Sequence, residues 1–151
     1  MSRIQELFKR KQKKVLNIYC TAGYPLLNST IEVMEALEEN GADIIELGIP
    51  YSDPLADGPV IQESGGVALQ NGMTIKTLLG QLQQLRSSVS VPVILMSYIN
   101  PVLQYGFERF CKEVAEAGVD GLIFPDLPIR EFDTEYGPVI KKYRLDFIFL
   151  V

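Results

Sequence analysis

The sequence predicts an α/β fold in which helices cover a parallel sheet. Five apolar, β-rich runs begin at Val15, Asp43, Val93, Val119 and Phe147, and their starts lie 28, 50, 26 and 28 residues apart. Helical patterns lie between these runs, and strands that alternate with helices at this period are typical of βαβ units. Two architectures are consistent with the pattern: an open doubly wound sheet and part of a (β/α)8 barrel.

The joints between helix and strand repeat along the chain. "ENGADIIELGIP" (39–50) and "EAGVDGLIFPD" (116–126) share a Glu, then a Gly, then an Asp that leads into an apolar strand and a proline exit. A repeated helix–Gly–strand unit of this kind again favours successive βαβ units and a parallel sheet buried on both faces.

The end of the sequence favours the barrel. The fifth run, "FIFLV", reaches Val151 with no helical pattern after it, whereas an open five-stranded domain would cover its last strand. A barrel of this type takes about 250 residues. We therefore expect residues 1–151 to be the N-terminal portion of a single TIM-barrel domain, with strands 1 to 5 and about the first half of the barrel. The outer edges of strands 1 and 5 would then be exposed.

The clearest helix is expected after the first strand. Ser29 and Glu32 have the spacing of a capping box, and the pattern ends before Gly41. The expected apolar stripe of this helix consists of Thr30, Val33, Met34 and Leu37. An earlier helix is expected to end in the basic run "KRKQKK" (9–14), and a later helix to begin near Pro59, since proline is favoured in a first turn.

Composition and charge exclude several classes of function. The chain is 47% hydrophobic with a net charge of -5, which argues against nucleic acid or an anionic membrane as its main partner. No secretion signal and no apolar run long enough to span a bilayer is present. Cys20 and Cys111 lie far apart without metal-ligand spacing. We therefore expect a cytoplasmic protein without a metal site.

The sequence contains no histidine. Ser-His-Asp and Cys-His catalysis and nearly every zinc site are therefore excluded. Any acid–base chemistry has to come from Asp, Glu, Lys, Tyr or Cys. Neither a P-loop nor a G-x-G-x-x-G motif is present.

Glu46 is the first candidate for such chemistry. Alternation along "DIIELG" places Glu46 on the face opposite Ile45 and Leu47. If those two apolar residues meet the helices, Glu46 points into the barrel near its mouth, where partial burial would raise the pKa of a carboxyl group. The alternative is an ion-paired acid near a strand end, because ion pairs also perturb carboxylates.

The segment after this strand, "IPYSDPLADGPV" (49–60), is expected to form a long loop on the active face of the sheet. Asp53 and Asp57 within it could be functional or could serve as turn and cap residues. Further candidates at the barrel mouth follow the other strands: Tyr19, Thr21, Tyr98, Asn100 and Asp126. Each could equally be packing or turn chemistry.

Four stretches resemble one known family. "ELGIPYSDPLADGPVIQ" (46–62) closely resembles the signature of the tryptophan synthase alpha subunit. The resemblance continues in "YCTAGYP" (19–25), "MSYINPVLQYGFERF" (96–110) and "AGVDGLIFPDLPIRE" (117–131), and therefore runs along the whole chain.

The resemblance implies a retro-aldol cleavage of indole-3-glycerol phosphate to indole and glyceraldehyde 3-phosphate. By that resemblance Glu46, before "LGIP", is the catalytic acid–base, and Asp57, in "LADG", is the partner of the indole N–H. The implied indole pocket consists of Tyr19, Met96, Tyr98, Ile123 and Pro125.

The resemblance also implies a partner, the tryptophan synthase beta subunit, with which the family forms an alpha2beta2 heterotetramer. The residues implied to face it are Asp53, Pro54, Asn100 and Glu131. No cofactor is expected in this chain, since the pyridoxal phosphate of the complex belongs to the beta subunit.

The sequence departs from the family pattern in one respect. The family binds the substrate phosphate in loops after later strands, as many barrels do, and those strands are absent from these 151 residues. We therefore expect the chain alone to be inactive. The alternatives are a non-catalytic fragment that only docks on the beta subunit, a fragment without function, and another barrel lyase acting on a phosphorylated sugar, which would not explain "YSDPLADG".

Overall fold

The structure, a computed structural model, describes residues 1–150. One sheet contains the strands β1 (Asn17–Thr21), β2 (Ile44–Gly48), β3 (Val93–Met96), β4 (Gly121–Ile123) and β5 (Asp146–Phe147). The helices are α1 (Arg3–Arg10), α2 (Thr30–Glu39), α3 (Pro59–Gln70), α4 (Ile75–Gln81), α5 (Leu85–Ser88), α6 (Ile99–Tyr105), α7 (Phe107–Glu116), α8 (Ile129–Glu131) and α9 (Gly137–Lys142). Short 3-10 turns cover Leu27–Ser29 and Leu82–Gln84, and a π-helical turn covers Phe132–Tyr136.

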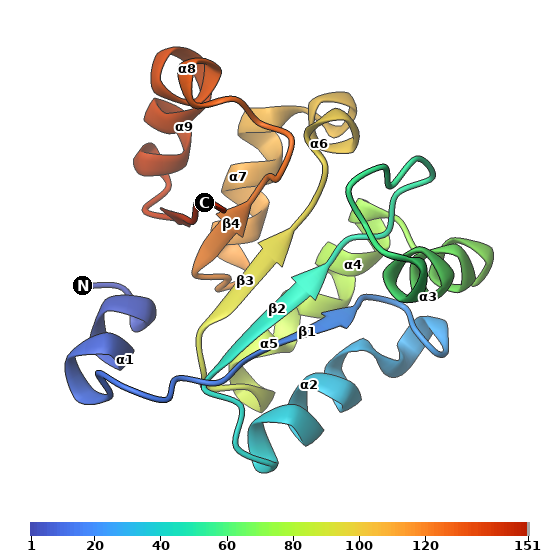
Figure 1. Cartoon of the computed structure of the whole chain (residues 1–151), viewed down its shortest axis with the longest axis horizontal. Helices are drawn as coiled ribbons and strands as arrows, with labels where there is room; N and C mark the ends of the chain where they lie inside the picture. Colours follow the sequence, from blue (N-terminus) through green and yellow to red (C-terminus); the bar gives the residue numbers. More distant parts are fainter. Residues whose placement is uncertain (151) are drawn as a thin grey trace.

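The strand order distinguishes between the two expected architectures. All neighbouring strands are parallel and follow the chain in the order β1-β2-β3-β4-β5. A doubly wound sheet reverses its order at a switch point, whereas a barrel adds each strand beside the previous one. Figure 1 shows the same progression, with α2 to α9 following the outer side of the sheet and α1 lying near the strand starts.

The outer face of the sheet forms the main core. Ile45 and Leu47 are completely buried there, as the alternation along the strand predicted. They belong to a cluster that includes Ala68 of α3, Leu78 of α4 and Phe110 of α7. Because helices cover this face, its strand positions carry only apolar side chains.

The inner face carries a second, smaller apolar cluster. Ile44, Ile94 and Ile123, from three neighbouring strands, pack with Leu7 of α1. Helix α1 therefore covers the inner face near the strand starts, which leaves the carboxyl ends of the strands for a site.

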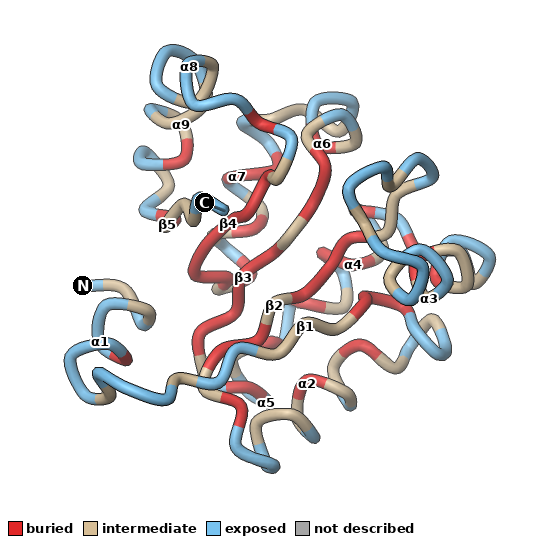
Figure 2. Tube along the Cα trace, in the orientation of Figure 1, coloured by how far each residue is buried: buried red, intermediate tan, exposed pale blue. Residues whose placement is uncertain are grey.

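The two edges of the sheet are its least buried part. Every residue of β4 is buried, whereas both residues of β5 and most of β1 are only half-buried or exposed (Figure 2). Beyond β5, Phe149 and Leu150 are exposed by 42% and 62%. The exposure expected at strands 1 and 5 is confirmed.

The two repeated segments, 39–50 and 116–126, share a glycine that has the same conformational role in both. Gly41 and Gly118 each follow a helix with a positive φ, +97° and +86°, which residues with a side chain rarely adopt. At Gly118 a Cβ atom would also come within 2.8 Å of Arg86 Cγ. The shared glycine thus turns the chain from a helix into the following strand.

The repeated aspartates also have equivalent roles. Asp43 accepts a hydrogen bond from the Leu16 backbone N–H at 2.7 Å and from Lys11 Nζ at 2.6 Å. Asp120 accepts from the Val93 backbone N–H at 2.8 Å. Each carboxylate therefore ties the start of its own strand to the start of the preceding one.

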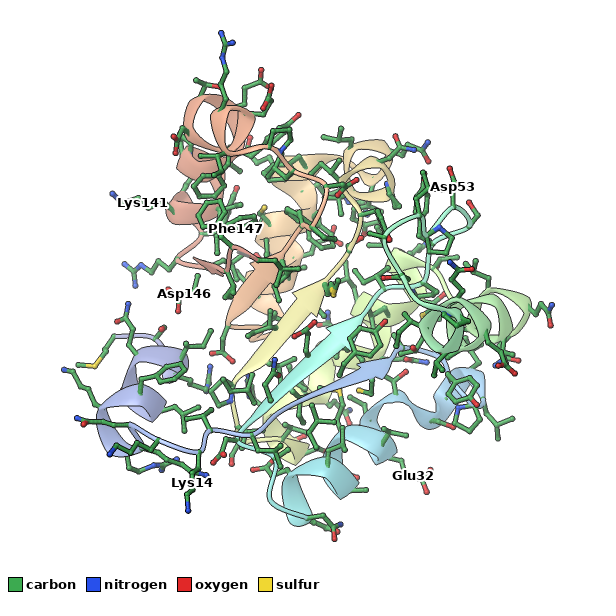
Figure 3. The ribbon with its side chains drawn as sticks, viewed as in Figure 1. Lys14, Glu32, Asp53, Lys141, Asp146 and Phe147 are labelled. Carbon is green, nitrogen blue, oxygen red and sulfur yellow. The ribbon has the colours of Figure 1, made fainter. Side chains whose placement is uncertain are left out.

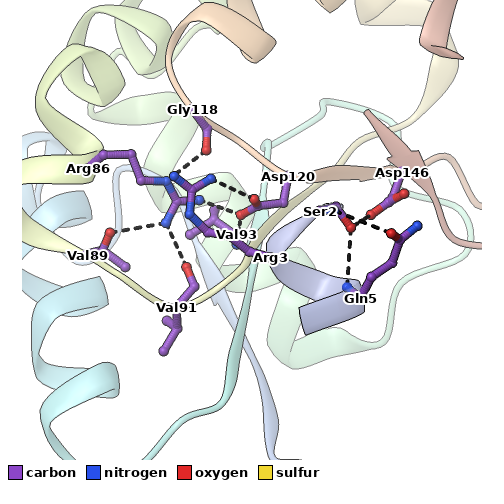
Figure 4. A network of polar contacts seen from close by, with 10 residues as sticks. All are labelled: Ser2, Arg3, Gln5, Arg86, Val89, Val91, Val93, Gly118, Asp120 and Asp146. Atoms are coloured by element: carbon purple, nitrogen blue, oxygen red, sulfur yellow. Dashed lines mark hydrogen bonds and ion pairs between the residues drawn. The ribbon is translucent and has the colours of Figure 1, made fainter. Parts of the chain in front are cut away.

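Asp120 is also the centre of a buried ion network (Figure 4). It is 6% exposed and forms ion pairs with Arg86 and, at 2.9 Å, with Arg3 of α1. Arg86 in turn donates to the backbone carbonyls of Gly118, Val89 and Val91. Burial lowers the pKa of the Arg86 guanidinium, and the Asp120 carboxylate opposes that effect.

The predicted capping box of α2 is wrong. Ser29 already has a helical conformation, because a 3-10 turn precedes the helix, and its hydroxyl accepts from the Leu26 N–H at 3.3 Å. Glu32 is exposed and points away from the sheet (Figure 3). The helix nonetheless covers the expected residues, Thr30–Glu39, and the expected helix start at Pro59 is confirmed.

Candidate active site at the carboxyl ends of the strands

Five of the predicted site residues surround one small cavity above the strand ends. The walls include Tyr19 from β1, Asp57 from the β2–α3 loop, Met96 from β3, and Tyr98 and Pro125 from the segments that follow β3 and β4. The cavity volume is about 10 Å³. That is space for about one water molecule, so a ligand with an aromatic ring enters only if these walls move apart.

Tyr19 reaches the cavity because a glycine lies beneath it. A Cβ atom on Gly48 would lie 1.9 Å from the Tyr19 hydroxyl oxygen and 2.4 Å from the ring carbon that carries it. Burial raises the pKa of Tyr19, and a hydrogen bond with Thr21 opposes the shift. Tyr19 was a candidate from the sequence, whereas Gly48 was not, because its role depends on a neighbouring strand.

Substitution of Gly48 is therefore expected to displace the Tyr19 ring. Gly48→Ala should destabilise the chain by about 1–3 kcal/mol, the usual cost of overpacking a well-packed interior. Denaturant unfolding measures the loss, and the aromatic NMR signals of Tyr19 should change. Gly80→Ala is the control, because no atom lies within 4 Å of its added Cβ and alanine favours the helix. A Gly48→Ala chain with parent stability and unchanged Tyr19 signals would contradict this account.

Asp57 and Tyr98 lie together at the cavity. The Tyr98 hydroxyl accepts a hydrogen bond from the Ala56 backbone N–H at 2.9 Å. Burial raises the pKa of Asp57, and the nearby Tyr98 hydroxyl opposes that shift. The Tyr98 ring also lies 5.3 Å from the ring of Tyr51, which tethers the loop to α6.

Glu46 lies on the inner face, in register with Tyr19 of β1 and Ile94 of β3. Its Oε2 atom accepts a hydrogen bond from Asn17 Nδ2 at 2.9 Å. Within residues 1–150 no ion pair involves Glu46, so the alternative that Glu46 is an ion-paired acid near a strand end is wrong. Asn17 pairs with Ile44, two residues nearer the strand starts than Glu46, and Glu46 is not one of the walls of the cavity.

Ile123 is placed beside the cavity but does not line it. It is 2% exposed, pairs in register with Met96, and belongs to the inner apolar cluster. Tyr98 and Asn100 were expected at the end of strand 3, but β3 stops at Met96, so both residues lie after the strand. Tyr98 instead caps α6 and Asn100 lies in its first turn. Asp126 accepts from the Ile99 N–H at 3.0 Å at the same helix start.

The four residues expected at a partner surface are not gathered around the cavity. Asp53 is exposed and projects from the β2–α3 loop (Figure 3), and Pro54 follows it. Asn100 is exposed and donates to the Tyr51 hydroxyl at 3.2 Å. The Glu131 Oε2 atom of α8 is buried without a hydrogen-bond partner in the described chain.

Within residues 1–150, no helix has the length and hydropathy that a membrane span requires. In the same residues, no three or more Cys, Asp or Glu side chains are grouped so that they could hold a metal ion.

The parallel strands follow one another in unbroken order, helices cover the outer face, and carboxylates lie near the strand ends. These features are those of part of a barrel protein, a class whose sites lie at the carboxyl ends of the strands. The family model described as tryptophan synthase alpha chain matches residues 5–151. The chain belongs to this family, and its fold is the first half of a (β/α)8 barrel.

Relatives and solved structures agree with this assignment. The tryptophan synthase alpha chain of Flavobacterium johnsoniae is 53% identical over 151 residues, which are 100% of this chain and 59% of the relative. The alpha chain of Parabacteroides distasonis is 49% identical with the same coverage. The chain thus spans about 59% of the length of these curated relatives.

Among solved structures, tryptophan synthase subunit alpha from Legionella pneumophila superposes with a TM-score of 0.94 at 42% identity, covering 100% of this chain and 59% of that one. Tryptophan synthase from M. tuberculosis in its aminoacrylate-bound form gives a TM-score of 0.92 at 37% identity, covering 100% and 62%.

Proposed function

We propose that this chain carries the acid–base centre of a lyase of tryptophan biosynthesis, which cleaves indole-3-glycerol phosphate to indole and glyceraldehyde 3-phosphate. The observation that carries the proposal is the convergence of Tyr19, Asp57, Met96, Tyr98 and Pro125 on one cavity, in a chain of this family. These side chains come from four separate segments, so their convergence is a property of the fold.

Glu46 supplies the proton transfers in this proposal. Protonation of indole C3 converts the ring into a cationic 3H-indolium (iminium) form, and removal of the proton from the adjacent side-chain hydroxyl lets the carbon–carbon bond break. The electrons of that bond return to the ring and restore indole, while the hydroxyl carbon becomes the aldehyde of glyceraldehyde 3-phosphate. One proton is given and one is taken, which a carboxyl group can do without a metal or cofactor.

Asp57 stabilises the charge that develops during the same step. The indole nitrogen becomes positive when C3 is protonated, and a carboxylate that accepts its N–H favours that state. The Tyr98 hydroxyl opposes the rise in the pKa of Asp57, so an entering indole N–H would compete with that interaction. Tyr19, Met96 and Pro125 supply the apolar walls.

The proposed partner is the tryptophan synthase beta subunit, which would take the released indole and carry the pyridoxal phosphate. One observation favours docking beside the β2–α3 loop: a mostly apolar groove of about 430 Å³ runs between Pro50, Tyr51 and Pro101. Asp53, Pro54 and Asn100 adjoin the groove in sequence. Docking without catalysis, the second candidate, would use this same surface.

The proposal is tested by completing the barrel. Residues 1–150 are joined to the remaining part of the Flavobacterium johnsoniae alpha chain, and indole release is compared with that of the unmodified relative and of residues 1–151 alone. The joined protein should release indole, whereas residues 1–151 should release none, since the loops that hold the phosphate in many barrels follow later strands. Each protein is also titrated with the beta subunit of the same relative.

One result would decide against the catalytic role, and another against the expected inactivity of residues 1–151. A joined protein that unfolds cooperatively but releases no indole, while the relative does, removes the catalytic role. If it still binds the beta subunit, docking alone remains. Indole release by residues 1–151 that disappears in Glu46→Gln would instead show that later strands are not needed.

A further inference from the structure

We propose that Asn17 is a positioning residue for Glu46, which it holds through a hydrogen bond from an uncharged amide. The inference rests on the proposed role of Glu46 and adds a residue that the family signature does not include. Its basis is the contact between Asn17 Nδ2 and Glu46 Oε2 at 2.9 Å.

The strand register brings the two side chains together. Tyr19 is paired with Glu46, and Asn17 lies two residues earlier in β1, so both project from the inner face. An ionised carboxylate can only accept hydrogen bonds, so the amide has to present its NH2 group to it. The contact is therefore defined by the chemistry of both groups as well as by the distance.

Among the described residues, no other side chain donates a hydrogen bond to the Glu46 carboxylate. The neighbouring inner-face residues Ile44 and Ile94 are apolar. The Tyr19 hydroxyl lies over Gly48, on the side toward the cavity. In the described chain, Asn17 provides the hydrogen bond to the Glu46 carboxylate, and β propensity does not account for an asparagine in a strand.

An uncharged partner suits a carboxyl group that gives and takes protons. A lysine or arginine would strongly favour the ionised form. An asparagine carries both donors and an acceptor, so it can donate to the carboxylate and, after rotation, accept from the protonated acid. Asn17 can thus keep Glu46 in place through both halves of the reaction.

Steady-state kinetics of the joined protein test the role. Asn17→Leu should lower kcat about 10- to 100-fold, as small misplacements of a catalytic group do, with KM within about twofold of the parent. Asn17→Gln, which retains the amide, should recover part of that loss. Asn40→Leu is the matched control, because Asn40 is an exposed asparagine that bonds only the Ala36 carbonyl of α2, and it should leave kcat unchanged.

A spectroscopic measurement on residues 1–151 tests the contact itself. The side-chain amide NMR signals of Asn17 should shift in Glu46→Gln and stay near their parent positions in Glu32→Gln. Asn17 amide signals that do not shift in Glu46→Gln overturn the inference. An active joined protein in which Asn17→Leu keeps the parent kcat or changes only KM overturns it as well. A joined protein that is inactive with Asn17 intact overturns the proposed function, and the kinetic role of Asn17 with it.

Discussion

Glu46→Gln in the joined protein is expected to lower kcat for indole release by about 10²- to 10⁴-fold, the range that a positioned acid–base contributes. Glutamine keeps the size of the side chain and can still hydrogen-bond Asn17, which lies 2.9 Å from the present carboxylate. It cannot give or take the proton. The loss should therefore appear in kcat, with KM little changed.

The companion variant and the control separate chemistry from folding. Asp57→Asn should lower kcat by about 10²- to 10³-fold, since it removes charge stabilisation but not the proton transfer. Glu32→Gln, at an exposed site of α2, should retain parent activity. A Glu46→Gln enzyme that keeps a tenth or more of the parent kcat would assign the proton transfers to another residue.

Asp120→Ala is expected to be the most destabilising single change in the chain. It removes a carboxylate that is 6% exposed and leaves Arg86, whose side chain is 19% exposed, without its anionic partner. Breaking a buried ion pair on one side costs about 3–5 kcal/mol. The same change also leaves the Val93 N–H without its acceptor.

The other half of the network provides the matched control. Arg3 contacts the same carboxylate, but its side chain is 45% exposed, so Arg3→Ala should cost about 1 kcal/mol or less. Urea unfolding of the 151-residue chain compares the two, and Asp120→Asn, which keeps an acceptor but loses the charge, should fall between them. Equal losses for Asp120→Ala and Arg3→Ala would show that burial does not determine the strength of this network (Figure 4).

Local patterns in the sequence predicted the strands well. Each of the five apolar runs overlaps one of the five parallel strands, although only Phe147 of the fifth run lies in β5 and Val151 is outside the described residues. The alternation around Glu46 correctly assigned Ile45 and Leu47 to the helical side, because a parallel strand buried on both faces leaves a continuous apolar signal. The capping box at Ser29 failed because a preceding 3-10 turn gives Ser29 a helical conformation, so its side chain does not cap α2.

The candidate site was only partly predictable. Alternation and strand ends made Glu46, Asp57, Tyr19 and Tyr98 candidates, the family resemblance gave their roles and added Met96, Ile123 and Pro125, and the structure gathers five of these residues around one cavity. Asn17 lies two residues before Tyr19 in β1, so alternation places both side chains on the inner face. A polar residue at that position could therefore have been predicted from the sequence to lie near Glu46. Gly48 carried no such signal, because its role depends on a ring that belongs to another strand.

The sequence by itself determined the repeating βαβ units, the family and the acids near the second strand, because these follow from residue types at short spacings. Only the tertiary structure decided that the strands follow one another without a switch point, that Asn17 rather than a cation contacts Glu46, and that Tyr98 lies with Asp57 at one cavity. Strand order and side-chain partners depend on register between segments that lie 26 to 50 residues apart in the sequence, and local patterns do not contain that information.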